Sequence, residues 1–496
     1  MKHLTFIYDR VLLLILWGGI LSCGLFSSCM SDEDYTLSPS ARLTFSVDTV
    51  NLDTIINGQM TNTYTFQVFN HNEDAIRISR LYLERGASSP FRVIADGTSL
   101  EGGEARDLEI GGKDFMYVFL SAKTEEADSD KPVKNEDKLM FVTEGGMSQE
   151  VVLRTYGQDV IPLHRKVLKR DTLLDARRPY QIFDSLVVAA GCTLTLKPGV
   201  RLYFHPDARL VVHGTLIAEG DTGNPVQLRG DRLGTMFSQQ PYDRIPGQWG
   251  GVVFTGESYG NKLNHCDIHS ATFGIRCDSS DVDKETLLLE NSMVHNMSGD
   301  VLTVRSARVF VGNSQLTNAG GNCVTLRGGH STFVQCTIGN FYAFSGGRGV
   351  ALDYSNMDGE VRLPLYQAAF RNCLISGYSS DEIMGSRSER YTDDAFEYLF
   401  QNCLLDTPEF EDEGKIVNCL WDNDDNEVYR EKNFSPEFDL KKLVFTFGLD
   451  RRSQAVDHAD PAVAAGYPYD LNGKDRFADG RPDIGCYECT ESGDTQ

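Results

Sequence analysis

Leu263-Asn264-His265-Cys266-Asp267-Ile268 is the first clear copy of a six-residue pattern. Positions one and six are apolar, position three is polar, and position four is Cys or Ser. Later copies occupy residues 289–294, 311–316, 333–338, 370–375, 400–405 and 416–421. Their third positions (265, 291, 313, 335, 372, 402 and 418) are spaced by 26, 22, 22, 37, 30 and 16 residues. A core period of 22 to 26 residues with insertions is typical of a solenoid.

The pattern predicts a corner in each repeat. Positions one and six lie five residues apart, so a straight strand would point them to opposite faces. A bend at position three returns both to the interior, and Asn tolerates the left-handed backbone that this bend needs. Stacked asparagines can also form a hydrogen-bonded ladder. Position four then points inward, which predicts one interior column of small, reduced side chains: Cys266, Ser292, Ser314, Cys336, Cys373, Cys403 and Cys419.

The repeat resembles the right-handed parallel β-helix, and the resemblance covers about half of the chain, residues 171–430. Two further stretches resemble segments of Bacteroidota surface lipoproteins that carry this repeat. One is Gly247-Gln248-Trp249-Gly250-Gly251-Val252-Val253-Phe254; the other runs from Asp470-Leu471-Asn472-Gly473 to Asp483-Ile484-Gly485-Cys486-Tyr487-Glu488. The resemblance implies that residues 435–489 cap the last rung, where strand edges would otherwise be unpaired. Residues 490–496 are a tail.

Residues 41–160 alternate apolar and polar side chains with period two, as half-buried strands do. Leu43-Thr44-Phe45-Ser46-Val47 and Tyr64-Thr65-Phe66-Gln67-Val68 are examples. Turn residues separate about seven such stretches, which predicts an immunoglobulin-like β-sandwich. Residues 43–70 also resemble the sandwich that opens many Bacteroidota surface lipoproteins, which implies a spacer or docking role. The expected fold is therefore all-β, a sandwich followed by a β-helix.

Residues 1–28 are predicted to be a signal peptide. Lys2 and Arg10 precede an apolar run over residues 11–21. Small residues then lead into Cys23 and Cys29, and both sites resemble a lipobox, which implies acylation, for instance by palmitate. We expect Cys29 to be acylated, because the acidic residues 32–34 resemble an outer-membrane export signal. Cys23, which follows Ile20-Leu21-Ser22, is the alternative.

The leader implies a lipid-anchored, surface-exposed protein of the cell outer membrane, with residues 29–40 as a tether. The 496-residue chain has 47 basic and 71 acidic side chains, a formal net charge of −24. Nucleic-acid binding requires basic stripes, so this composition excludes it. No stretch after residue 30 is long and apolar enough to span a bilayer, so membrane attachment is expected through the lipid.

Few residues suggest chemistry. His269 and His295 hold the seventh position of adjacent repeats and should stack on the outer surface, but Thr317 and Gly339 follow in that column. With no third ligand and no aligned carboxylate, the sequence predicts no metal site, no cofactor and no catalytic residue there. Cys486 and Cys489 lack a second Cys/His pair, which favours a local disulfide or thiols over zinc.

Loops inserted into a rigid stack are better candidates for binding. Arg and aromatic side chains are the usual anchors of protein interfaces. The insertion at 229–249 contributes Arg232, Tyr242, Arg244 and Trp249. The insertion at 341–364 contributes Arg348, Tyr354 and Arg362, and the insertion at 377–394 contributes Arg387, Arg390 and Tyr391. Separately, Thr49, Thr54, Thr172 and Ser185 resemble O-glycosylation acceptors of Bacteroidota.

The sequence therefore favours a non-catalytic, surface-exposed lipoprotein that binds or scaffolds. Its β-helix loops are expected to engage an outer-membrane protein complex or a surface glycan. The alternative is a polysaccharide lyase or glycoside hydrolase acting on an acidic polysaccharide, which rests on fold-level analogy alone.

Overall fold

The computed structural model describes residues 35–237, 240–422, 433–435 and 445–489. Contacts divide the chain into two compact units. The first holds the described residues up to Asn51 together with Thr63–Ser121 and Glu136–Arg154. The second holds Leu52–Asn62, Ala122–Asn135 and the described residues from Thr155 onward. Among the described residues, no helix is long and apolar enough to cross a membrane.

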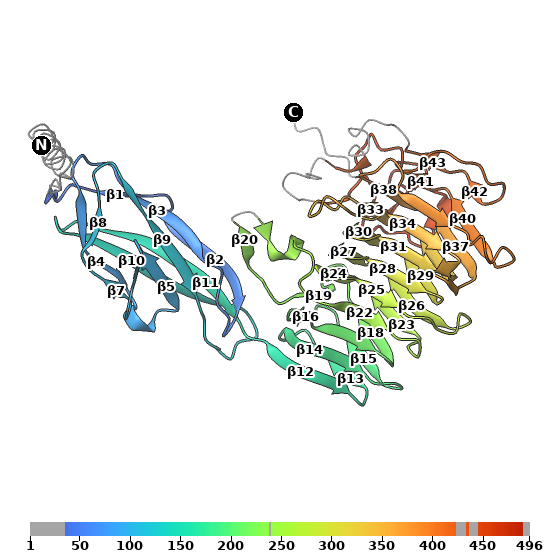
Figure 1. Cartoon of the computed structure of the whole chain (residues 1–496), viewed down its shortest axis with the longest axis horizontal. Coiled ribbons are helices and arrows are strands. Elements are labelled where there is room, and N and C mark those ends of the chain that lie inside the picture. Colours follow the sequence, from blue (N-terminus) through green and yellow to red (C-terminus); the bar gives the residue numbers. More distant parts are fainter. Residues whose placement is uncertain (1–34, 238–239, 423–432, 436–444, 490–496) are drawn as a thin grey trace, which may run out of the picture. The chain divides into compact units, whose positions relative to one another are not determined.

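The N-terminal strands form two sheets (Figure 1). The first has the order β1 (Leu43–Phe45), β3 (Tyr64–Asn70), β9 (Phe115–Ala122), β5 (Phe91–Ala95), β6 (Thr98–Ser99). The second has the order β2 (Thr49–Ile56), β11 (Ser148–Gln158), β10 (Val133–Thr143), β4 (Ile76–Leu83), β7 (Glu104–Ala105), and β8 (Leu108–Ile110) also pairs with β4. The pairs β1–β3, β3–β9 and β4–β10 are antiparallel. Period-two alternation buries Phe66, Val118 and Phe141, as a sandwich requires.

From Ile161 onward the main strands pair in parallel and stack as successive rungs (Figure 1). We call the three faces of this parallel β-helix A, B and C. Face A is a ten-stranded sheet: β13 (Thr172–Leu174), β15 (Thr193–Leu196), β18 (Thr215–Glu219), β23 (Asn261–Asn264), β26 (Glu285–Glu290), β29 (Arg308–Gly312), β32 (Gly329–Val334), β37 (Leu365–Arg371), β40 (Phe396–Gln401) and β42 (Ile416–Val417).

Faces B and C belong to one 18-stranded sheet. The long strand β14 (Tyr180–Val188) joins them, because it pairs with the first strand of both faces and with β12 (Ile161–Leu168). Face B contains β16 (Arg201–Phe204), β19 (Val226–Gly230), β24 (Cys266–His269), β27 (Met293–Met297), β30 (Gln315–Ala319), β33 (Thr337–Asn340), β38 (Leu374–Gly377), β41 (Leu404–Leu405) and β43 (Leu420–Trp421). Face C contains β17 (Arg209–Val212), β22 (Gly251–Phe254), β25 (Ile275–Cys277), β28 (Leu302–Arg305), β31 (Val324–Arg327), β34 (Leu352–Ser355) and β39 (Ile383–Ser386).

The predicted corner lies between faces A and B. All seven third-position residues have a positive φ, from 47° to 53°: His265, Asn291, Asn313, Gln335, Asn372, Asn402 and Asn418. Asn291 donates its amide to the Asn264 Oδ1 at 2.8 Å, and Asn313 donates to the Asn291 Oδ1 at 2.8 Å. The predicted asparagine ladder is therefore present at these rungs.

The interior of the β-helix is one continuous apolar core. The fourth-position Cys and Ser residues point into it, and all of them are buried except the half-buried Cys419 near the end of the stack. There is no disulfide among the described cysteines, so Cys486 and Cys489 do not form the local bridge that the sequence left open. Phe333, Phe370 and Phe400 stack on successive rungs with ring centroids 4.8 and 5.0 Å apart.

The boundaries differ from the prediction in two places. Parallel pairing begins at Ile161, ten residues before the expected start of the β-helix at 171. Residues 435–489 were expected to cap the last rung. Of these the structure describes residue 435 and residues 445–489, and residues 445–489 pack along the side of the stack. We call residues 445–489, which include the short helix α3 (Pro461–Ala464), the C-terminal segment.

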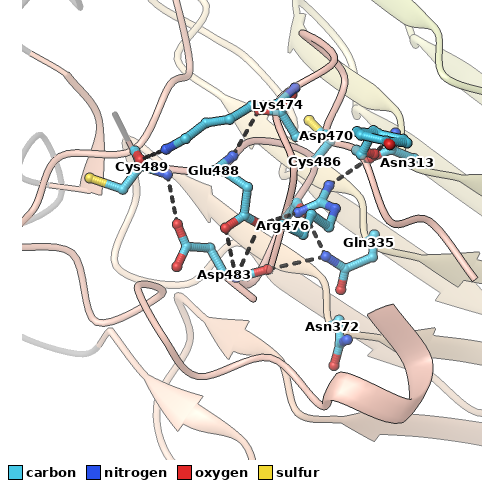
Figure 2. A network of polar contacts seen from close by, with 12 residues as sticks. Asn313, Gln335, Asn372, Asp470, Lys474, Arg476, Asp483, Cys486, Glu488 and Cys489 are labelled. Carbon is cyan, nitrogen blue, oxygen red and sulfur yellow. Dashed lines mark hydrogen bonds and ion pairs between the residues drawn. The ribbon is translucent and has the colours of Figure 1, made fainter. Parts of the chain in front are cut away.

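The C-terminal segment contacts the corner residues of several rungs (Figure 2). Arg476 donates to the Asn313 Oδ1 at 2.6 Å and to Glu488 at 2.5 Å. Gln335 donates to the carbonyls of Asp483 and Gly485 at 3.1 and 3.2 Å. Asn372 exchanges two bonds with the backbone of Asp460 at 2.9 and 3.0 Å. The side chains that turn each corner therefore also attach this segment.

Phe370→Ala should lower the free energy of unfolding of the β-helix by about 3–5 kcal/mol, because it leaves a cavity between two stacked rings. Tyr366→Ala is the matched control on the same strand, since Tyr366 is 45% exposed; it should change the free energy by less than about 1 kcal/mol. Chemical denaturation followed by circular dichroism measures both. Equal effects of the two substitutions would contradict the inward register of β37.

Candidate functional site

A polar cluster lies on the outer surface of face B, on strands β19, β24 and β27. The pairing register places His269 directly opposite His295, and Asp267 in the neighbouring column, opposite Met293. The side chains of Asp267 and His269 are two residues apart on one strand, so both point outward. We call Arg229, Asp243, Asp267, His269 and His295 the histidine cluster.

Asp267 connects the two imidazoles. Its Oδ1 lies 2.9 Å from the His269 Nδ1 and 3.1 Å from the His295 Nε2, both within hydrogen-bonding distance. The two rings stack with centroids 5.1 Å apart. The expectation that these histidines lack an aligned carboxylate is therefore wrong. The sequence did contain the signal, because Asp267-Ile268-His269 places a carboxylate and an imidazole on the same strand face.

Asp243 enters from the insertion between β19 and β22, where the hairpin of β20 (Thr235–Phe237) and β21 (Gln240–Pro241) precedes the short 3-10 helix η2 (Tyr242–Arg244). Its carboxylate lies 3.3 Å from the His269 Nε2 and is ion-paired with Arg229. Its carbonyl accepts a 2.7 Å bond from Ser270, next to β24. Sequence reasoning missed Asp243, since the path of an irregular loop does not follow the repeat.

The charges in the cluster alternate. Burial acts to lower the pKa of His269, but the carboxylates of Asp267 and Asp243 outweigh it and raise this pKa to about 9. Burial likewise opposes ionisation of Asp267, yet the imidazoles of His269 and His295 hold its pKa well below the usual value. The contacts between opposite charges therefore run from Arg229 through Asp243 and His269 to Asp267.

The side chains of the histidine cluster differ in how far they are exposed to solvent. The His269 side chain is 4% exposed, Asp267 16%, His295 22% and Asp243 46%. Tyr487 of the C-terminal segment donates to the Gln315 Oε1 at 2.6 Å on the next rung of face B. Solvent therefore reaches the cluster through His295 and Asp243. A carboxylate-oriented imidazole there can exchange protons, and two imidazoles with one carboxylate can bind a metal ion.

The predicted binding residues separate into buried and surface groups. Trp249 is fully buried and stacks on Phe204 with ring centroids 4.2 Å apart. Tyr354 is 4% exposed and packs inside the β-helix against Phe396 and Phe400. Both were predicted to bind a partner, and both are core residues instead. Tyr242 is also buried, beneath Arg232.

The other predicted arginines and Tyr391 lie at the surface or partly exposed. Arg244 and Arg348 are half-buried, whereas Arg232, Arg362, Arg387 and Arg390 are exposed. Arg348 lies over the Tyr378 ring at 4.8 Å, and Arg390 over Tyr391 at 5.6 Å. The proposed glycosylation residues Thr49, Thr54, Thr172 and Ser185 are exposed or half-buried on strands. Cys23 and Cys29 lie outside the described residues.

Comparison with known proteins gives no assignment. No family model and no curated protein matches the chain. Similar solved structures include an ASH/PapD-like domain of human CEP192 (10% identity, 25% of this chain, 90% of that chain, TM-score 0.17). A second is a family 123 glycoside hydrolase from Clostridium perfringens (7% identity, 25% of this chain, 31% of that chain, TM-score 0.17). A third is the BcpA major pilin of Bacillus cereus (13% identity, 26% of this chain, 44% of that chain, TM-score 0.15). Scores this low support no conclusion about function.

A buried carboxyl in the insertion at 377–394 makes stability depend on pH. Burial raises the pKa of Glu382 to about 7, from an ordinary 4.5. A carboxyl whose pKa is higher in the folded chain favours folding while it is protonated. Its contribution is full below pH 4.5 and is lost as the pH rises through 7, by up to about 3 kcal/mol.

Glu382→Gln should therefore flatten the decline in unfolding free energy between pH 4.5 and pH 7.5, measured by urea denaturation at each pH. Glu389→Gln, which changes an exposed residue of the same insertion, is the control and should keep the wild-type slope. The difference between the two variants isolates Glu382 from other titrating groups. Parallel curves for both variants would show that Glu382 ionises as freely in the folded as in the unfolded chain.

Proposed function

We propose that this chain is a surface-exposed outer-membrane lipoprotein that acts as a non-catalytic binding or scaffold protein. Its β-helix engages an outer-membrane protein complex through the insertions near β34 and β39. The observation that carries the proposal is how the arginines of these insertions are held. Arg362 is ion-paired with Asp394. Arg348 and Arg390 lie over tyrosine rings, and Arg387 donates to a backbone carbonyl.

The pairing is specific. The Nε of Arg362 donates to the carboxylate of Asp394 at 2.6 and 2.8 Å. Arg348 lies 3.8 Å from Glu382 and donates to Ser379 at 3.2 Å. An arginine that is neutralised by a carboxylate, as Arg362 is, is poorly suited to an acidic polysaccharide, which requires uncompensated positive charge. Pre-ordered arginines beside tyrosines are typical of protein interfaces, since little conformational entropy is lost on binding.

Two groups of these residues flank β39. Tyr378 and Arg348 lie before the strand, while Arg387, Arg390 and Tyr391 follow it. The Arg387 guanidinium donates to the Thr392 carbonyl at 2.5 Å, which fixes it within the same insertion. A partner that spans face C at this rung would contact both groups. A surface glycan remains the other binding partner that these exposed aromatic side chains suit.

The Asp267–His295 pair favours one second candidate, an enzyme that acts on acidic polysaccharide. Asp267 orients the His295 imidazole, which is a common arrangement for a general base. Such an enzyme needs an unpaired cation to neutralise the carboxylate of its substrate. Among the described residues, the histidine cluster offers none, because Arg229 is paired with Asp243. We therefore favour binding over catalysis.

Lipidation is tested by growth with a labelled fatty acid. Cys29→Ala should abolish incorporation of the label, because the acylated sulfur is lost. Cys23→Ala should leave it intact, and protease added to intact cells should digest the wild-type protein. Loss of label in Cys23→Ala alone would move the anchor to Cys23. Full protection from external protease would contradict surface exposure.

Binding is tested by cross-linking in intact cells and co-purification in mild detergent. The double substitution Arg390→Ala/Tyr391→Ala should reduce recovery of a specific outer-membrane partner at least tenfold. Arg276→Ala is the matched control, since Arg276 also lies over an aromatic ring, Phe273, at 5.4 Å on an earlier rung; it should not change recovery. Release of unsaturated oligosaccharides from acidic polysaccharides, lost in His295→Ala, would instead establish the enzyme.

A further inference from the structure

We propose that Asp267, His269 and His295 bind one divalent transition-metal ion of the zinc class. Three donor atoms of these residues, one from each side chain, lie within 4.8 Å of one another. They come from two adjacent rungs, β24 and β27, so the in-register stacking of the solenoid fixes their relative positions. This inference does not depend on the proposed binding function.

The distances suit a metal after a small adjustment. The Asp267 Oδ1 lies 2.9 Å from the His269 Nδ1 and 3.1 Å from the His295 Nε2. Zinc bonds of about 2.1 Å in a tetrahedron place neighbouring donors ~3.4 Å apart. Each of these two donor pairs must therefore separate by a few tenths of an ångström, and the donor atoms of the two imidazoles lie within 4.8 Å of each other. Rotation of the side chains supplies that shift, because His295 and Asp267 are partly exposed.

The structure also contains the partner that orients a metal-bound imidazole. Histidine ligands usually donate their second ring N–H to a carboxylate, which fixes the tautomer and the ring. If His269 binds the ion through Nδ1, its Nε2–H points to the Asp243 carboxylate at 3.3 Å. Asp243 is in turn ion-paired with the buried Arg229. The carboxylate that orients the His269 ring thus comes from a loop that the repeat does not encode.

The donor set selects the class of ion. Two imidazole nitrogens and one carboxylate oxygen suit zinc, cobalt, nickel or copper, whereas calcium and magnesium require mainly oxygen donors. Three protein ligands leave a fourth tetrahedral position for water or for a group from a partner. The partly exposed side chains of His295 and Asp243 lie on the side from which such a ligand arrives.

Metal binding requires that the His269 Nδ1 and the His295 Nε2 carry no proton. A proton on either atom moves to the other nitrogen of the same ring where that nitrogen is unprotonated, and is otherwise released to solvent. No other group of the chain has to accept it.

The experiment uses the untagged mature lipoprotein in detergent, stripped with a chelator and dialysed. Equilibrium dialysis against zinc chloride with elemental analysis should give one ion per chain. His295→Ala and Asp267→Asn should each weaken zinc binding at least tenfold. Asp243→Asn keeps all three ligands, so it should retain the stoichiometry and weaken binding by about 10–100-fold. His330→Ala is the matched control, because His330 points outward from β32 and stacks on Tyr366 instead.

Cobalt substitution provides a second measurement that does not rely on the ligand variants. Cobalt should give the visible absorption of a four-coordinate site without thiolate charge-transfer bands. Thiolate bands would assign the ion to cysteines and overturn the proposal. So would the absence of stoichiometric zinc binding by the wild-type chain, or equal binding by His295→Ala. Circular dichroism of each stripped variant must match the wild type, which separates lost ligation from misfolding.

Discussion

The left-handed residue between faces A and B is the constraint on which the rest of this β-helix depends. It allows apolar residues five apart to point into the same core, and it fixes the register of every following strand. Asn is suited to it because a short polar side chain reduces the strain of a positive φ. The same side chain then donates a hydrogen bond to the preceding rung, as Asn291 and Asn313 do.

Because the corner fixes the register, it also builds the outer surface. Equivalent outward positions on successive rungs are separated by the strand spacing of about 4.8 Å. Rings at such positions stack, and a side chain in the next column can reach two rungs at once. The histidine cluster is this arrangement: His269 and His295 are equivalent, and Asp267 on β24 reaches the imidazoles of both rungs. A stacked fold therefore converts a repeat into a site whenever one column carries two donors.

Two irregular segments add what the repeat cannot supply. The insertion before β22 brings Asp243 to His269, while the C-terminal segment bonds to Asn313, Gln335 and Asn372 along the corner. Both segments attach to side chains that are already ordered by the stack, so the entropy lost in holding them is that of the segments alone.

The sequence by itself determined the solenoid, the position of its corner and the interior cysteine column, since these follow from local side-chain alternation repeated in register. It also held the signal for Asp267 beside His269. Only the tertiary structure decided that Trp249 and Tyr354 are core residues. Insertions interrupt the repeat there, so the sequence no longer shows which side chains point inward and which point outward. Only the tertiary structure placed Asp243 and the C-terminal segment, since contacts between residues far apart in the chain depend on loop paths that no repeat encodes.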